Sequence, residues 1–184
     1  MNVDDSTSTH EVFIALGSNL GDRLSILQDA IQRMPPMVRP LECSPIYETP
    51  PWGFTDQPLF LNQVIRANTV LNPFDLLAYL KQIEIQLGRQ ATFRNGPRLI
   101  DLDILFYEDL ILETKTLTIP HPRLAERGFV LVPLKDLAPH LRHPITGLTV
   151  LEMLAQVDTS GILPVSLVEC DKWMKNVGSK PPSD

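Results

Sequence analysis

The chain has 184 residues, of which 43% are hydrophobic and 21% are charged, and its formal net charge at pH 7 is −6. This length suits one ordinary domain that buries a proper hydrophobic core. The acidic balance gives no electrostatic basis for binding nucleic acid or an anionic membrane surface, and no apolar run approaches the roughly 20 residues that a membrane helix needs.

The two cysteines, Cys43 and Cys170, lie far apart and lack the spacing of metal ligands. They are typical of reduced thiols in a cytoplasmic protein. The first ten residues are polar and acidic, so they predict no signal peptide. We expect a single domain at 11–174 between flexible tails at 1–10 and 175–184, and no pattern marks an oligomer interface, so we expect a monomer.

The first predicted element is a buried strand at 12–16, because five apolar residues run without interruption up to Gly17. The loop 17–21 follows, and then a helix from about Asp22 to Met34. A glycine loop between a strand and a helix suggests a phosphate-binding loop, but no Gly-Lys-Ser/Thr follows and the glycine spacing does not fit a dinucleotide fingerprint. A tight turn is the better interpretation.

Residues 37–49 form an extended stretch that Pro40 and Pro45 interrupt, which indicates a sheet edge or a β-bulge. The loop that follows, 49–58, contains three prolines and a glycine, so it excludes regular structure. Trp52, Phe54 and Phe60 in and after this loop are costly to leave in water. The residues alone leave two hypotheses at even odds: the loop folds over the core, or it forms an aromatic wall for a planar ligand.

A strand is predicted at 61–71, and Asn72 followed by Pro73 is typical of a capped helix start. This helix ends at Gly88. The apolar stripe that we expect it to bury consists of Phe74, Leu77, Leu80, Ile83 and Leu87.

A further strand is predicted at 100–107, which completes the order β-α-β-β-α-β. That order predicts an α+β fold: a ferredoxin-like antiparallel sheet with helices packed on its faces. Beyond it we expect C-terminal additions: two short extended pieces within 110–119, helices at about 124–137 and 149–156, and a final strand near 164–169.

The strand at 100–107 contains the candidate metal-binding residues. The alternation of its side chains places Asp101 and Asp103 on one face. The same alternation assigns Phe106 to the opposite face and Tyr107 to the face of the aspartates. Two carboxylates about 6.5–7 Å apart can hold one or two hard cations. The alternative is the solvated face of an edge strand, and for this motif alone that alternative is the better one. The nearby Arg89, Arg94 and Arg98 shift the balance toward a site for a metal-bound polyphosphate.

Six blocks of the sequence, in order and in register, resemble the 6-hydroxymethyl-7,8-dihydropterin pyrophosphokinases of folate biosynthesis. Together they cover about residues 12–158. The blocks are IALGSNLGDR at 14–23, SPIYETPPWG at 44–53, FLNQV at 60–64, LGR at 87–89, RNGPRLIDLDIL at 94–105 and IPHPRLAERGFVLVPL at 119–134.

The resemblance implies an ATP-dependent diphosphotransferase that moves the β,γ-diphosphate of ATP to the pterin hydroxymethyl oxygen and releases AMP. It implies two Mg²⁺ ions held by Asp101 and Asp103, with Arg89 and Arg98 closing over the phosphates as catalytic residues. The partners that it implies are ATP and the pterin, with no nucleic acid and no membrane. Of the two hypotheses for the 49–60 loop, the resemblance favours the aromatic wall for a planar ligand.

The resemblance further assigns residues to each substrate. The pterin would contact Thr49, Pro50, Trp52, Phe60, Asn62 and Phe129. The nucleotide would contact Arg89 and Arg98 together with Lys81, Glu84, Ile104, Thr116, Leu117, Thr118, His121 and Arg127. Taken without the resemblance, Phe129 fits a helix core, His121 fits a turn between two prolines, and Glu84 fits an exposed helix charge.

Two other functions use the same features. A metal-dependent nucleotidyltransferase would use paired aspartates on such a sheet to attack the α-phosphorus and release diphosphate. A ferredoxin-like RNA-binding or regulatory module would need exposed aromatics and a basic surface, which the acidic composition argues against.

Overall fold

The computed structural model describes residues 8–90, 92–93 and 95–165. Most of the expected tails, Arg94 and most of the expected final strand lie outside these residues. The elements in chain order are β1 (His10–Ser18), α1 (Arg23–Gln32), β2 (Val38–Cys43), β3 (Tyr47–Thr49), β4 (Phe60–Thr69), α2 (Pro73–Gln86), β5 (Asp101–Tyr107), β6 (Leu112–Glu113), β7 (Thr118–Ile119), the 3₁₀ helix η1 (Leu124–Glu126), α3 (Gly128–Leu137), α4 (Val150–Leu154) and β8 (Leu163–Pro164).

The main sheet has the strand order β5-β1-β4-β3-β8, and β2 also pairs with β4. Each of these pairings is antiparallel. Strand β1 is therefore central, between β4 and β5, as its continuous apolar run predicts. The predicted ferredoxin-like α+β fold with C-terminal additions is confirmed.

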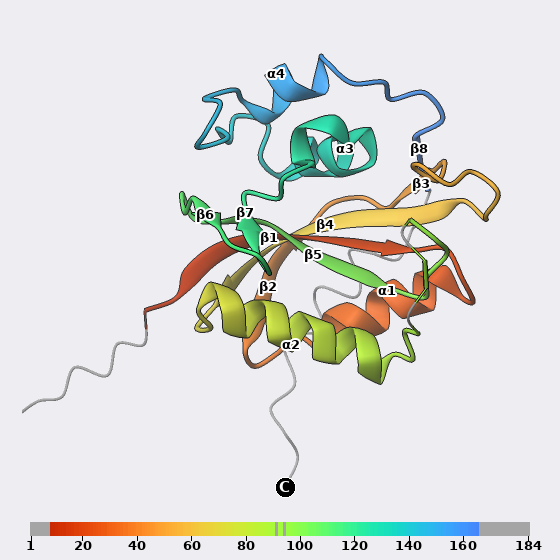
Figure 1. Cartoon of the computed structure of the whole chain (residues 1–184), viewed down its shortest axis with the longest axis horizontal. Coiled ribbons are helices and arrows are strands. Elements are labelled where there is room, and N and C mark those ends of the chain that lie inside the picture. The colour runs from red at the N-terminus through yellow and green to blue at the C-terminus, as the bar shows by residue number, and fades with distance from the viewer. Residues whose placement is uncertain (1–7, 91, 94, 166–184) are drawn as a thin grey trace, which may run out of the picture.

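Helices cover both faces of the sheet (Figure 1): α1 and α2 lie on one face, and α3 and α4 lie on the other. Leu27, Leu80 and Leu102 belong to the core under α1 and α2. Val64, Leu131 and Met153 belong to the second core, under α3 and α4. The cavity described below opens on the face of α3.

The start of α2 follows from its sequence. The side-chain oxygen of Asn72 accepts hydrogen bonds from the backbone N–H groups of Phe74 and Asp75, each at 3.0 Å, and Pro73 takes the first helical position. At the other end Gly88 adopts a φ of 88°, a conformation that costs glycine little. These two signals place α2 so that its last turn runs alongside β5.

Two details of the predicted pattern are wrong. Residue Leu105 has no partner in β1, because the register shifts between Phe13 and Ile14. This bulge reverses the alternation, so Phe106 packs in the core under α3 and Tyr107 packs in the core under α2. In α2, Leu76 is buried in place of Phe74, which is 47% exposed, because the helix turns its N-terminal ring away from the sheet.

Within the described residues, no helix combines the length and the apolar composition needed to cross a bilayer.

The cap of α2 gives a stability prediction. Replacing Asn72 with Ala should lower the free energy of unfolding by about 1 kcal/mol, because two N–H groups of the first turn lose their acceptor. Urea denaturation measures this loss. The control is Gln82→Ala on the exposed side of the same helix, which should change the stability by less than about 0.5 kcal/mol. Equal effects of the two variants would contradict the role of the cap.

Candidate active site

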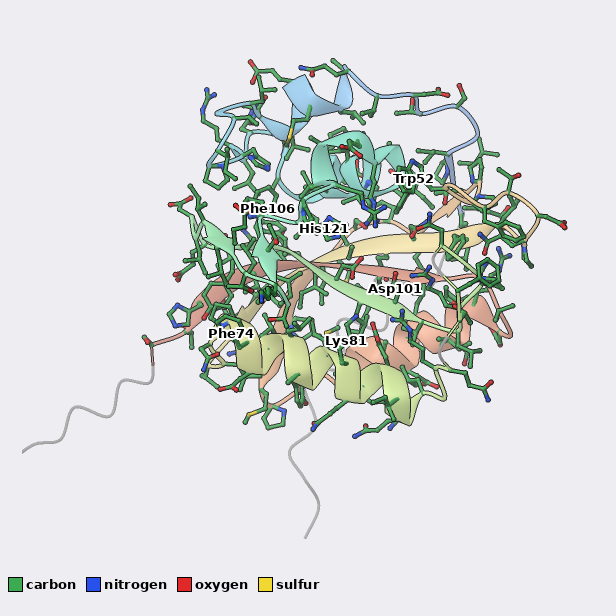
Figure 2. All side chains as sticks on the ribbon, viewed as in Figure 1. Trp52, Phe74, Lys81, Asp101, Phe106 and His121 are labelled. Carbon is green, nitrogen blue, oxygen red and sulfur yellow. The ribbon has the colours of Figure 1, made fainter. Side chains whose placement is uncertain are left out.

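One cavity of about 470 Å³ lies between the sheet, the N-terminus of α3 and the loops that follow β3 and α2. Its volume is in the range of small-molecule sites. In Figure 2, Trp52 and His121 lie on the α3 side of the sheet, and Lys81 comes from α2 on the other side. The cavity therefore extends around the outer edge of β5, where segments distant in the sequence meet.

The cavity collects most of the residues that the sequence assigns to a site. All four of the predicted catalytic residues and all six of the predicted pterin residues line it. Of the predicted nucleotide residues, it is lined by Lys81, Arg89, Arg98, His121 and Arg127. The other five do not line it: Glu84, Ile104, Thr116, Leu117 and Thr118.

Asp101 is neutralised by two arginines. Its Oδ1 accepts a hydrogen bond from Arg89 and its Oδ2 accepts one from Arg98, each at 2.7 Å. Burial acts to raise the pKa of Asp101, but the charges of Arg98, Arg89 and Lys81 outweigh burial and hold this pKa below its ordinary value. In this arrangement both carboxylate oxygens of Asp101 are occupied.

Asp103 has looser surroundings. Its Oδ2 lies 3.7 Å from the Nη1 of Arg127 and 3.9 Å from the Nε2 of His121, both beyond hydrogen-bond length. Its side chain is 30% exposed, on the same strand face as Asp101. Among the described residues, Asp103 is thus the carboxylate of the cavity with lone pairs free to accept a new ligand.

Glu84 lies behind the cavity wall and supports it. It is 2% exposed, and its Oε1 accepts hydrogen bonds from the Nζ of Lys81 and from the backbone N–H of Leu102, each at 2.7 Å. Its Oε2 lies 2.6 Å from the Nη1 of Arg89. Burial raises the pKa of Glu84 against the opposing effect of these donors. Glu84 thus satisfies the outer edge of β5 and fixes Arg89 from behind.

His121 is held as a neutral ring. Its Nδ1 accepts a hydrogen bond from the backbone N–H of Arg123 at 3.2 Å, which assigns the proton of the neutral imidazole to Nε2. Burial lowers the pKa of His121, and Asp103 only partly opposes this. The Nε2 lies at the cavity, 3.9 Å from the Oδ2 of Asp103 and 3.5 Å from the Nη1 of Arg127.

Aromatic rings and one amide shape the other end of the cavity. Phe60, Phe129 and Trp52 line it, and the Nδ2 of Asn62 donates to the Oγ1 of Thr49 at 2.7 Å. A Cβ atom at Gly17 would lie 2.9 Å from the Oδ1 of Asn62, so the glycine of the first loop allows this close approach. Thr49, Pro50, Trp52 and Phe60 line the cavity, which favours the hypothesis of a ligand wall for the 49–60 loop over a loop folded on the core.

The charge of the cavity is the opposite of the charge of the chain. Five cationic side chains and two carboxylates line it, although the whole chain carries −6. The Nε of Arg127 is buried without a hydrogen-bond partner among the described residues, and burial lowers the pKa of this guanidinium. Such a cavity favours a polyanion.

Sequence reasoning missed several lining residues, among them Gln90, Thr92, Phe93, Asn95 and Arg123. The first four lie in the loop 89–99, where no regular element predicts which side chains point inward. Arg123 follows a proline turn, and its position gives no local signal of a function. A contact across the molecule, described below, distinguishes it.

The carboxylates fit a hard divalent cation only in part. Within the described residues, no group of three or more histidine, cysteine, aspartate or glutamate side chains could hold a metal ion. Asp101 and Asp103 nevertheless supply oxygen ligands on one strand face at the wall of a cationic cavity. The donor set fits Mg²⁺ if the phosphates of a substrate complete the coordination.

These ion pairs predict different stabilities for two similar variants. Asp101→Asn should lower the free energy of unfolding by about 1–2 kcal/mol, because two guanidinium groups lose a half-buried counter-charge. Asp103→Asn should change it by less than about 0.5 kcal/mol. Urea denaturation in EDTA measures both. A variant at 101 that is as stable as the wild type would contradict the assignment of the pairs.

The same comparison has a pH dependence. The pKa of Asp101 is lower in the folded protein than in the unfolded chain, so its stabilisation is present above the unfolded value of about 3.9 and is lost as the pH falls through the folded value. The stability difference between wild type and Asp101→Asn should therefore be full at pH 7 and should shrink below about pH 4.

Comparison with known proteins agrees with this geometry. The model of the family described as 7,8-dihydro-6-hydroxymethylpterin-pyrophosphokinase (HPPK) matches residues 13–139. The chain is 45% identical over 152 residues to the 2-amino-4-hydroxy-6-hydroxymethyldihydropteridine pyrophosphokinase of Methylorubrum extorquens, covering 82% of this chain and 95% of that protein. The protein of the same name from Aquifex aeolicus is 43% identical, with coverages of 73% and 84%.

Other relatives are much longer. The folic acid synthesis protein fol1 of Pneumocystis carinii is 44% identical over 163 residues, which are 88% of this chain and 22% of that protein. The chain spans between 22% and 26% of the length of three such relatives.

The fold also resembles solved structures. A crystal structure of wild-type Plasmodium falciparum HPPK-DHPS matches 81% of this chain and 45% of that one, with a TM-score of 0.64 and 16% identity. From the family match and the identity to full-length relatives, this chain belongs to the 7,8-dihydro-6-hydroxymethylpterin-pyrophosphokinase family.

Proposed function

We propose that this chain transfers the β,γ-diphosphate of ATP to the hydroxymethyl group of 6-hydroxymethyl-7,8-dihydropterin, giving AMP and the pterin diphosphate for folate biosynthesis. The observation that carries the proposal is a single cavity that joins aromatic walls to a carboxylate pair surrounded by arginines. Relatives that this chain covers almost entirely are named for this reaction.

The aromatic end of the cavity suits the pterin. Phe60 and Phe129 would stack on its two faces, and the amide of Asn62 would read the polar edge of the ring. Thr49 holds that amide in place through its Oγ1, because Asn62 donates to it. Pro50 and Trp52 would close the side of the slot.

The cationic end suits the triphosphate. Asp101 and Asp103 would hold two Mg²⁺ ions together with oxygens of the phosphates. Bound there, the ions would offset the charge on the transferring group and bring the acceptor oxygen and the β-phosphorus into line. Lys81, His121 and Arg127 line the same end and would contact the nucleotide. The proposed roles of Glu84, Ile104, Thr116, Leu117 and Thr118 toward ATP stay predictions.

Arg89 and Arg98 are the side chains that would hold the diphosphate during its transfer. Arg89 and Arg98 contact Asp101, and they would move to the phosphate oxygens when ATP arrives. Charge-assisted hydrogen bonds from both guanidinium groups would then hold the diphosphate as it is transferred. Glu84 would keep the Nη1 of Arg89 anchored while the rest of the guanidinium turns to the phosphate, because this contact does not depend on Asp101.

Location and assembly stay proposals of the same kind: a cytoplasmic monomer that binds ATP and the pterin, without nucleic acid or membrane. The composition and the cysteine spacing support them.

Product analysis tests the proposal. The protein is mixed with ATP, Mg²⁺ and 6-hydroxymethyl-7,8-dihydropterin, and the nucleotides are separated by chromatography. Pterin-dependent AMP without free diphosphate is the expected result. ADP would indicate transfer of a single phosphoryl group, free diphosphate would indicate a nucleotidyltransferase, and no turnover by the folded protein would favour a binding module.

Asp103, the carboxylate with free lone pairs, should have a large effect on kcat. Asp103→Asn should lower kcat by about 100-fold or more, because the cation loses a ligand that no neighbouring residue replaces. Steady-state kinetics measures this effect, and urea denaturation confirms that the variant is folded. Near-normal turnover would exclude Asp103 as a metal ligand.

The proposed role of Asn62 predicts that its loss affects the affinity for the pterin and leaves the affinity for ATP unchanged. Asn62→Ala should weaken pterin binding by roughly 5- to 10-fold, because the amide that would pair with the ring is lost, and should leave ATP binding unchanged. Calorimetric titration measures both affinities. Asn68→Ala, at the other end of β4, is the control and should change neither. Equal losses for both ligands would place the pterin elsewhere.

A further inference from the structure

Arg123 lines the cavity but is absent from the set of residues that the sequence assigns to it. It directly precedes η1, and its backbone N–H donates to His121 as described above. Its side chain points to Trp52: the guanidinium carbon lies 5.1 Å from the centroid of the indole ring. This distance is within the range of a cation–π contact.

The Arg123 contact is the shorter of the two cationic contacts on the indole. Trp52 lies in an irregular loop and is 39% exposed. Among the described residues, its ring has two charged neighbours, the guanidinium groups of Arg123 and of Arg127, which lies 5.5 Å from the centroid. No aromatic ring of the described residues stacks on Trp52.

The two arginines are not equivalent. Arg127 also lies 5.5 Å from the ring of Phe129, 3.7 Å from Asp103 and 3.5 Å from the Nε2 of His121, so with Trp52 its guanidinium has four partners. Arg123 has no ion pair with a carboxylate among the described residues, unlike Arg89, Arg98 and Arg127. Trp52 is therefore the distinctive partner of the Arg123 side chain.

The placement of Arg123 is also costly in electrostatic terms. Its charge lies close enough to Arg127 to repel that guanidinium and close enough to His121 to disfavour protonation of the ring. Asp103 is the carboxylate near both of them. A cationic side chain without a carboxylate partner, placed beside another cation, is expected at a functional site.

We propose that Arg123 is a positioning residue for the pterin: its guanidinium stacks on the Trp52 indole and holds that ring as a wall of the pterin pocket. This inference rests on the proposed function. It assigns Arg123 an effect on pterin affinity that passes through Trp52, and no direct contact with the phosphates.

The test uses Arg123→Met, which keeps an apolar stem on the indole and removes the charge. Binding of 6-hydroxymethyl-7,8-dihydropterin is measured by calorimetry in the presence of Mg²⁺ and α,β-methylene-ATP. The β,γ-diphosphate of this analogue cannot be transferred, because a methylene group replaces the oxygen between the α- and β-phosphorus. The variant should bind the pterin about 3- to 10-fold more weakly and should bind the nucleotide as the wild type does. Arg39→Met, an exposed arginine on β2, is the control and should change neither affinity.

A double-mutant cycle shows whether the effect passes through the indole. In a Trp52→Leu background, Arg123→Met should cause no further loss of pterin affinity. Arg123→Lys should restore part of the affinity in the wild-type background, because it returns the charge without the planar group. In steady-state kinetics, the KM for the pterin should rise by a larger factor than kcat falls.

Three results would overturn the inference. A loss of the same size in the Trp52→Leu background would show that Arg123 acts without the indole. Weaker nucleotide binding with normal pterin binding would make Arg123 a phosphate-binding residue. Unchanged binding of both ligands would remove it from the site. Failure of the wild type itself to bind the pterin would instead reject the proposed function, so the two failures are distinguishable.

Discussion

Asp101 shares its two carboxylate oxygens between Arg89 and Arg98, and the rest of the site is arranged around this ion pair. Arg98 precedes β5 by a few residues, and Arg89 lies just after the end of α2, so one carboxylate ties both segments to the sheet. Without it, two guanidinium groups would face each other at the wall of a cavity that already has excess positive charge. The pair therefore stabilises the ligand-free protein and holds both arginines ready for a phosphate.

The fold supplies this arrangement through an exposed strand edge. Strand β5 pairs with β1 on one side, and on the other side the backbone of Leu102 is satisfied by Glu84 and Lys81 of α2. Side chains in place of a further strand leave the edge open enough for a cavity to extend around it. The same Glu84 holds Arg89, so the element that protects the edge also builds the site.

Much of this could be predicted from the sequence because the signals are local. Asn72 and Pro73 start α2 where the capping pattern predicts, and the order of elements predicts the ferredoxin-like sheet. Asn62 of β4 and Asp101 of β5 lie on either side of β1, where both pair with Gly17, and they meet in one cavity because of this order.

The rest depends on contacts between distant segments, which no local pattern encodes. The alternation of side chains along a strand contains no sign of the bulge at Leu105. For this reason the alternation predicts the wrong face of the sheet for Tyr107. Glu84 is indistinguishable in the sequence from an exposed helix charge until Leu102 is placed beside it. The contact that distinguishes Arg123 is made with Trp52, which lies in another loop.

The position of bond cleavage tests the central claim most directly. ATP labelled with ¹⁸O in the bridge between the α- and β-phosphorus is turned over with the pterin, and the products are analysed by mass spectrometry. Attack on the β-phosphorus breaks its bond to the bridging oxygen, so the label should appear in AMP. Label in diphosphate, with unlabelled nucleotide attached to the pterin, would mean attack on the α-phosphorus and would contradict the account.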